Sequence, residues 1–306
     1  MNKHVTVLMG GWSAEREVSL ASGKAVAEAL AARGYVVDTV DAGHDVAAAL
    51  AALEPRPDAV FNALHGRWGE DGNVQGLLNI IGLPYTHSGL LASALAMDKV
   101  VAKRLFAAAG ITCPDGVVVD IERAIAGHVM EPPYVVKPIN EGSSVGVHIV
   151  MAGGNYPGLD LATWQFGDSV LVERYIPGRE LTVVVMGDRA LGVTELRPHE
   201  GFYDYEAKYT DGKTNHLCPA PLPEKISRLA MDAALSAHHA LGCRGVSRAD
   251  LRYDDHEGEA GKLYLLEINT QPGMTPLSLV PEQAAQSGID FGALVSWMVE
   301  AAQCDT

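Results

Sequence analysis

Short apolar runs alternate with longer alanine-rich segments at the start of the chain. The run His4–Met9 has the β-rich character of a strand, and Gly10-Gly11 follows it as a turn. A helix is predicted from Glu15 to about Arg33, where Gly34 stops it. The alternation continues with a strand, a helix and a strand at Tyr35–Val40, Val46–Leu53 and Ala59–Leu64. The pattern predicts a parallel α/β sheet with ligands at the carboxyl ends of its strands.

The pattern changes after a break near Pro84–Ala96. A helix is predicted over Met97–Ala109, and a smaller α+β unit then extends from about Ile111 to Ile176. Its strands, which glycine-rich turns separate, are predicted at Tyr134–Lys137, Val145–Val150 and Ser169–Tyr175.

The last part of the chain combines antiparallel pairs with helices. Leu181–Met186 and Ala190–Leu196 are predicted to pair across a Gly187-Asp188 turn. Val246–Tyr253 and Lys262–Ile268 are predicted to pair across a polar segment, Asp254–Gly261. Helices are predicted at Pro223–Leu241, Ala284–Gly288 and Phe291–Ala302.

Composition excludes several classes of function. At 306 residues and 48% apolar content, the chain is long enough for two or three well-packed units. A formal charge of −15 argues against a nucleic-acid or anionic-membrane surface, which needs a basic face. No apolar run reaches the roughly 18 to 20 residues that span a bilayer. The four cysteines lack CxxC spacing, so neither a disulfide framework nor a zinc site is indicated. We expect a cytoplasmic location.

Two carboxylates, an amide and an arginine stand at the ends of two apolar runs. Glu267 and Asn269 are two residues apart, and in a strand such residues project from the same face. Arg248 and Asp250 end the preceding apolar stretch. Oxygen donors beside a cation suit Mg²⁺ shared with a phosphate. The alternative for Glu267 and Asn269 alone is an edge strand with solvated acids.

A glycine- and serine-rich segment, Asn140–Val147, follows the predicted strand that ends at Lys137. Backbone N–H groups in such a loop can approach a phosphate closely. Pro138 holds the chain extended and directs the lysine toward the loop. The alternative is a plain turn.

Three other segments are candidate ligand contacts. Glu173–Glu180 could supply backbone groups and apolar cover for a purine, or it could be an ordinary linker. Phe202–Tyr209 is dense in aromatic and charged residues, which suits a lid or a packed surface loop. His65–Gly72 lies at a strand end, although a lone His65 there is more often structural than catalytic.

Taken in order, these segments resemble the D-alanine–D-alanine ligase family of the ATP-grasp superfamily. The resemblance covers essentially the whole chain, and it is carried by Gly10–Ser19, His65–Gly72, Asp98-Lys99, Lys137 with Glu141–Gly146, Tyr203–Tyr209, and Arg248–Leu279. It implies an ATP-grasp fold of mixed α/β and α+β class, with a parallel α/β domain followed by two α+β lobes. The implied domains are residues 1–95, 96–176 and 177–306. The implied reaction joins two D-alanines for peptidoglycan synthesis.

The resemblance also implies how the nucleotide is bound. Lys99 and Lys137 would hold the ATP phosphates, covered by a loop that includes Ser144, and Glu180 would hold the ribose. The adenine would be framed by Glu173, Arg174, Tyr175 and Ile176. Two Mg²⁺ ions, or Mn²⁺ in their place, would be bound by Asp250, Glu267 and Asn269.

The amino-acid sites follow from the same resemblance. Glu15 would hold the ammonium group of the first D-alanine and would be bonded to Ser143 and Tyr209. The second D-alanine would bind its carboxylate to Lys208 and Ser278, and His65 and Leu279 would be further substrate-binding residues. Arg248 and the N–H of Gly273 would stabilise the oxyanion formed when the second amine attacks an acylphosphate. A homodimer is also implied.

Some positions depart from the family pattern. Arg174 stands where lysine is common, Ile139-Asn140 and Thr86-His87 are unusual, and Asp254–Gly261 is longer than expected. None removes a proposed catalytic group. Tyr209 favours a D-alanine product, because the relatives that use D-lactate have phenylalanine at the corresponding position. Two alternatives remain: an ATP-grasp ligase that takes D-serine second, and an inactive nucleotide-binding regulator.

Overall fold

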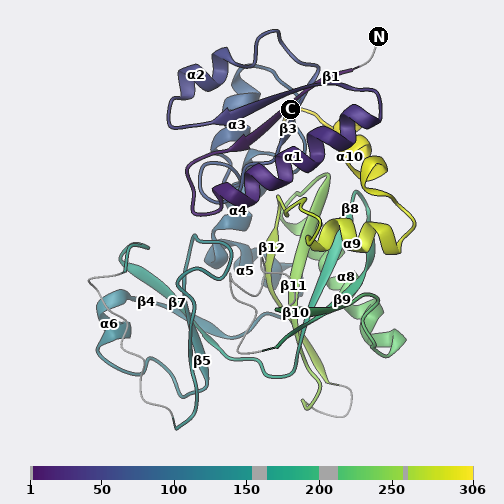
Figure 1. Cartoon of the computed structure of the whole chain (residues 1–306). Helices are drawn as coiled ribbons and strands as arrows, with labels where there is room; N and C mark the ends of the chain where they lie inside the picture. Colours follow the sequence, from purple (N-terminus) through teal and green to yellow (C-terminus); the bar gives the residue numbers. More distant parts are fainter. Residues whose placement is uncertain (1–2, 154–163, 200–212, 258–260, 306) are drawn as a thin grey trace.

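The computed structural model describes residues 3–153, 164–199, 213–257 and 261–305. Within these ranges the strands form three sheets, which Figure 1 shows as an upper unit and two lower ones. No helix in the described part of the chain is long and apolar enough to cross a membrane.

The first sheet is parallel, in the order β2-β1-β3, as the alternating pattern predicted. Its strands are β1 (His4–Gly10), β2 (Val36–Ala42) and β3 (Ala59–Asn62), and its helices are α1 (Arg16–Ala32), α2 (Val46–Ala51) and α3 (Asn73–Ile80). Helix α1 buries one face through Val18, Ser22, Val26 and Leu30, which are four residues apart. The carboxyl ends of β1 and β3 therefore lead into loops at the same edge of the sheet.

Two helices occupy the region between the first sheet and the others. Helix α4 (Leu90–Met97) lies within the predicted break near Pro84–Ala96, where no helix was expected. Helix α5 (Lys99–Ala108) begins immediately afterwards, and the Asp98 carboxylate accepts bonds from the N–H groups of Val100 and Val101. This cap separates two helices where one was predicted from Met97 onward.

The second sheet is antiparallel, in the order β4-β7-β5-β6. It contains β4 (Gly116–Asp120), β5 (Tyr134–Pro138), β6 (His148–Val150) and β7 (Ser169–Arg174), with α6 (Ile121–Ile125) beside it. Strand β4 and α6 were not predicted. Strand β6 is shorter than predicted, because Val145 and Val147 instead close turns onto the carbonyls of Gly142 and Ser144.

The third sheet has the order β10-β9-β8-β11-β12. Its strands are β8 (Arg179–Met186), β9 (Arg189–Pro198), β10 (Thr214–Leu217), β11 (Val246–Asp254) and β12 (Lys262–Asn269). Both predicted antiparallel pairs are confirmed, and β10 was not predicted. Helix α8 (Glu224–Ala240) buries a row of small side chains, Ile226, Ala230, Ala234 and Ala237, against this sheet.

The C-terminal helices connect the third sheet to the first. Helix α9 (Leu279–Gln286) starts earlier than the predicted segment at Ala284, and α10 (Phe291–Glu300) follows it. Val280 and Val295 lie in one core with Val5 of β1 and Val184 of β8. In Figure 1 these yellow helices lie between the upper unit and the third sheet. Two segments far apart in the sequence thus share a core.

Candidate active site

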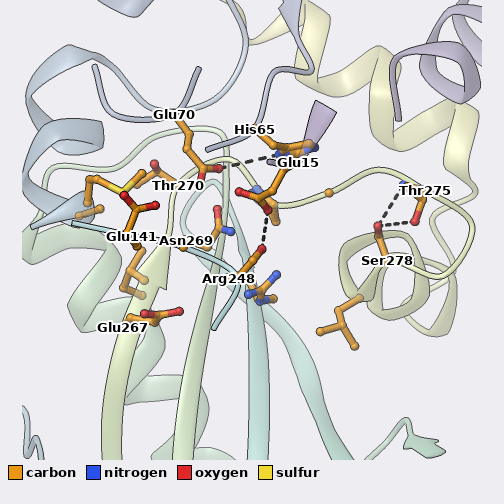
Figure 2. Close-up of a pocket in the computed structure, with 18 of the residues that line it drawn as sticks. Glu15, His65, Glu70, Glu141, Arg248, Glu267, Asn269, Thr270, Thr275 and Ser278 are labelled. Atoms are coloured by element: carbon orange, nitrogen blue, oxygen red, sulfur yellow. Dashed lines mark hydrogen bonds and ion pairs between the residues drawn. The ribbon is translucent and has the colours of Figure 1, made fainter. Parts of the chain in front are cut away.

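Two pockets lie next to each other where the three sheets meet. The first pocket contains Glu15, His65, Ser143, Arg248 and Ser278, and Figure 2 shows it. The second pocket is lined by Lys137, Glu173, Tyr175, Ile176 and Asp250, among others. The two pockets share a wall, which is formed by Lys99, Glu141, Gly142 and Glu267. A group bound at this wall is therefore accessible from both sides.

Strand pairing brings the predicted metal ligands together. Along β11, Ala249 and Leu251 face the core against α8, whereas Arg248 and Asp250 face the pockets. On the neighbouring strand β12, Glu267 is paired with Asp250 and Asn269 with Arg248. The four polar side chains thus form two cross-strand pairs, with three oxygen-bearing groups at one place.

A β-bulge makes this arrangement possible. The register shifts so that Asp250 is opposite Glu267 while Leu251 is opposite Leu265, which leaves Leu266 as the extra residue. Before the bulge Leu265 faces the core, and after it Ile268 does. Strict alternation would have turned Glu267 toward the core with Leu265. The bulge instead turns it toward the pockets, and Leu266 itself lines the second pocket.

Asp250 is held by several donors. Arg248 forms a bidentate pair with Asp250, in which Nε donates to Oδ1 at 2.9 Å and Nη2 donates to Oδ2 at 2.7 Å. Thr182 of β8 donates its hydroxyl to Oδ1 at 3.0 Å. The arginine and the carboxylate are thereby fixed relative to each other at the border of the two pockets.

The donor set matches a magnesium ion that is shared with phosphate. Among the described residues there is no group of three or more His, Cys, Asp or Glu side chains that could enclose a metal. Two carboxylates and one amide oxygen are nevertheless what Mg²⁺ takes from a protein when phosphate oxygens and water complete its shell. Asn269 accepts the N–H of Gln271 at 2.8 Å, which orients its amide oxygen.

Lysines gather beside this set on the second pocket's side. Lys99 Nζ lies 3.7 Å from Glu267 Oε2 and also donates to the carbonyl of Glu141. Lys137 Nζ lies 2.5 Å from Glu173 Oε2, and Lys103 is ion-paired with the same carboxylate. Burial, with Lys103 close by, lowers the pKa of Lys137 to about 7, and burial lowers that of Lys103 to about 8. An anion bound in the second pocket would lie beside Lys99 and Lys137.

The glycine- and serine-rich loop closes over the shared wall. Ser143 and Ser144 both have left-handed backbones, with φ of 51° and 59°. Non-glycine residues seldom adopt this conformation, and it is concentrated at functional sites. A Cβ at Gly142 would lie 3.4 Å from Glu70 Oε1 and 3.7 Å from Glu15 Oε2. The loop backbone thus packs directly against two carboxylates of the first pocket.

Carboxylates from the N-terminal unit line the first pocket. Ser143 donates its hydroxyl to the Glu15 carboxylate. The backbone N–H of Glu15 donates to the Ser13 hydroxyl oxygen, and this hydroxyl donates to the carbonyl of His65 at 2.7 Å. His65 Nδ1 is 3.8 Å from Glu70 Oε2. Burial raises the pKa of the Glu70 carboxyl, and the nearby Glu15 charge adds to this. An ammonium group bound at this end would relieve the repulsion between the two carboxylates, so this end of the pocket suits a cation.

The opposite wall of the first pocket is the start of α9. Ser278 precedes this helix, and its hydroxyl accepts the N–H of Thr275 at 2.9 Å. Gly273 lies so close that a Cβ there would be 2.9 Å from Ser278 Oγ. Figure 2 shows Ser278 and Thr275 facing Arg248 and Glu15 across the cavity. A helix N-terminus and a hydroxyl favour an anion at this end.

The segment predicted to frame a purine lines the second pocket. Tyr175 and Ile176 provide apolar cover together with Val135, Val147, Ile149 and Leu266. The Glu173 side chain is turned to the lysines, and Arg174 donates to the Tyr264 hydroxyl at 2.6 Å. Glu180 is 3.2 Å from Arg252, whose Nε donates to the carbonyl of Ile176. The pocket combines a flat apolar slot with polar groups at its edge.

The described residues contain most of the predicted site. Lys208 and Tyr209 of the predicted lid lie outside them. Leu279 lines the first pocket, and Ser144 lines the second. Sequence reasoning assigned no role to several pocket residues: Glu70, Glu141, Thr275 and Leu266. All four stand in segments that had already been selected, but nothing in the sequence distinguished them from their neighbours. Lys103, which lies outside both pockets, had no such signal.

Comparisons with known proteins identify the family of the chain. Residues 118–300 match a family model described as D-ala D-ala ligase C-terminus, and residues 43–88 match one described as D-ala D-ala ligase N-terminus. A D-alanine–D-alanine ligase from Parvibaculum lavamentivorans is 60% identical over 305 residues, which is 99% of this chain and 98% of that protein. One from Paramagnetospirillum magneticum is 59% identical over 308 residues, with both chains covered completely.

Solved structures give the same result. The D-alanine–D-alanine ligase from Bacillus anthracis complexed with ATP has a TM-score of 0.81 and 30% identity, covering 98% of this chain and 97% of its own. The D-Ala:D-Ser ligase from Enterococcus faecalis has a TM-score of 0.80 and 28% identity, covering 98% and 99%. The expected ATP-grasp fold is confirmed. The chain belongs to the D-alanine–D-alanine ligase family.

Proposed function

We propose that this enzyme joins two D-alanines to D-alanyl-D-alanine at the expense of ATP, through an acylphosphate, for peptidoglycan synthesis. The observation that carries the proposal is the wall shared by the two pockets, where Lys99 and Glu267 meet. A carboxylate in the first pocket and a triphosphate in the second would face each other there. A carboxylate is a poor electrophile, so phosphorylation is needed to give it a leaving group.

The second pocket is assigned to ATP. Tyr175 and Ile176 would cover the adenine, with backbone groups of Glu173 and Arg174 beside them, and Glu180 would hold the ribose hydroxyls. Lys99, Lys137 and the N–H groups around Ser144 would hold the phosphates. Supporting this, the ligase from Bacillus anthracis binds ATP on a similar fold.

Asp250, Glu267 and Asn269 would hold two Mg²⁺ ions, or Mn²⁺ in their place. Such ions neutralise charge on the phosphates and hold them in line for transfer. The chain's own contribution is to fix these oxygens on one face of β11 and β12.

The first pocket is assigned to the two amino acids. Glu15, held by Ser143 and also by Tyr209 in this proposal, would take the first ammonium group, with His65 and Glu70 behind it. Ser278, the N-terminus of α9 at Leu279 and Lys208 would take the second carboxylate. Arg248 and Gly273 line the same pocket, and the arginine and the Gly273 N–H would stabilise the tetrahedral oxyanion.

The alternative product, D-alanyl-D-serine, is less well supported. The relatives that are 59% and 60% identical to this chain are D-alanine–D-alanine ligases, whereas the D-Ala:D-Ser ligase shares 28%. The tyrosine at position 209 also favours D-alanine over D-lactate.

An assay of ADP release tests the proposal. With Mg²⁺ and ATP, release is expected to require D-alanine and not to be supported by L-alanine, because a site that fixes the ammonium, carboxylate and methyl groups of an amino acid together accepts only one enantiomer. D-serine as the only amino acid serves as the comparison for the alternative product. Equal ADP release without any amino acid would contradict the proposal.

The lysine cluster leads to a pH-dependent prediction. Because the pKa of Lys137 in the free protein is lowered to about 7, this group is largely neutral at pH 8, and a bound triphosphate would restore its charge. ATP binding at pH 8 is therefore expected to take up protons and to weaken as pH rises above about 7. Calorimetry in buffers with different ionisation enthalpies measures the uptake. Lys137→Arg, which stays charged, should reduce it.

Three wider assignments go with the proposal. The division into residues 1–95, 96–176 and 177–306 is supported by three separate sheets, although α9 and α10 pack on the first of them. A reaction that consumes ATP belongs in the compartment that supplies it, so we propose a cytoplasmic enzyme. A homodimer is proposed from the family resemblance alone.

A further inference from the structure

Lys103 is a partly buried lysine that the proposed mechanism does not use. It lies on α5 one turn after Lys99, so both side chains point the same way. Its ammonium group is ion-paired with Glu173 and lies 3.5 Å from the carbonyl of Pro114. The side chains of Lys103 and Glu173 are only 13% and 3% exposed.

The fold makes room for this contact. Gly116 of β4 is paired with Glu173 of β7, and a Cβ at Gly116 would lie 2.9 Å from Glu173 Cγ and 2.9 Å from the carbonyl of Val172. A side chain at position 116 would displace the Glu173 carboxylate. Glu173 is thus held by a close strand contact on one side and by two lysines on the other.

Lys103 does not itself reach the second pocket. The lining of that pocket includes Lys99, Lys137 and Glu173 but not Lys103. The contact that links Lys103 to the pocket lining is its ion pair with Glu173. This distinguishes it from the two lysines assigned to the phosphates.

The balance of charge around Glu173 depends on its ion pair with Lys103. With all groups ionised, the ammonium groups of Lys99, Lys103 and Lys137 face the carboxylates of Glu173 and Glu267. If Lys137 turned to a triphosphate and Lys103 were absent, Glu173 would be a buried carboxylate without a cation beside an anionic ligand. Buried charges are strongly unfavourable when one partner is removed.

We propose that Lys103 is a positioning residue for the nucleotide, which keeps Glu173 paired so that Lys137 is released from Glu173 to the triphosphate. The inference rests on the proposed function, because it takes the second pocket as the ATP site. Lys103 would also keep the Glu173–Ile176 segment in place over the adenine.

The test is ADP binding by calorimetry, with Mg²⁺ and without D-alanine. Lys103→Met is expected to raise the Kd for ADP roughly tenfold to a hundredfold, the scale on which loss of a partner to a buried charge is felt. In steady-state assays KM for ATP should rise, while KM for D-alanine changes by less than about threefold. Lys103→Arg should restore most of the binding. Arg104→Met, an exposed position on the same helix, is the matched control.

A double variant separates positioning from a structural role. In Glu173→Gln the ion pair between Lys103 and residue 173 is already lost. Lys103→Met combined with Glu173→Gln should therefore bind ADP within about twofold of Glu173→Gln alone. This comparison also serves if Lys103→Met by itself fails to fold. Wild-type affinity in Lys103→Met, or a further large loss in the double variant, would overturn the inference.

The inference about Lys103 and the proposed function fail on different results. If the wild-type enzyme releases ADP only with D-alanine and Lys103→Met still binds ADP normally, only the inference about Lys103 fails. If the wild-type enzyme binds no ADP in the presence of Mg²⁺, the assignment of the second pocket fails first, and the inference with it.

Discussion

Arg248→Ala is expected to lower kcat by about a hundredfold or more while the Kd for ATP changes by less than about threefold. Arg248 lines the pocket assigned to the amino acids and is fixed on Asp250 by two hydrogen bonds. Its positive charge would act mainly on the oxyanion that forms during amine attack. Charge that is placed in advance near a developing anion acts on the transition state more than on the substrate.

Two variants accompany this experiment. Arg248→Lys keeps the charge but cannot bind Asp250 in a two-pronged manner, so we expect an intermediate kcat. Arg228→Ala removes an exposed arginine on α8 and should leave kcat unchanged. ATP affinity is followed by calorimetry and turnover by ADP release. Near-normal turnover in Arg248→Ala would contradict the assigned role.

Glu267→Gln is the second substitution from which we expect a large loss, about a hundredfold to a thousandfold in kcat. The glutamine has nearly the same shape, so the packing of β12 should remain. The charge at the wall between the two pockets is lost, opposite Asp250 and beside Lys99. A site with one carboxylate fewer holds Mg²⁺ more weakly.

The concentration of Mg²⁺ that gives half-maximal activity is the decisive measurement. It should rise about tenfold or more in Glu267→Gln. Glu224→Gln, at an exposed glutamate on α8, is the control and should show the wild-type value. An unchanged Mg²⁺ dependence together with full turnover would rule out Glu267 as a ligand.

The sequence was most informative where local rules dominate. The parallel sheet, α1 and α8 followed from helical spacing and from short β-rich runs, because one buried face is enough to define such elements. The Glu267 and Asn269 pair followed from the two-residue period of a strand. Shorter elements were missed: β4 has mostly exposed valines, and β10 is a strand of four residues. The apolar run of β4 is only three valines long, and β10 is mostly polar, so neither gives a strong strand pattern.

Several features of the site depended on contacts between distant segments. The loop with the left-handed residues Ser143 and Ser144 packs against Glu15 and Glu70, which come from another unit. The role of Lys103 is likewise invisible in the sequence, because a lysine in a helix is normally solvated. Its burial follows from the meeting of α5 with Glu173 of β7.

By itself, then, the chain determined which residue types are available and which elements carry them, because helical and strand periodicities act over a few neighbours. Through its motifs it also determined the family, which the comparisons confirmed. Only the tertiary structure decided which of these groups face one another. The bulge at Leu266 is the clearest case, since a one-residue change of register there turns Glu267 from the core face to the pocket face. Such a shift is selected by packing across the sheet, with Leu265 and Ile268 both kept in the core, and not by the local sequence.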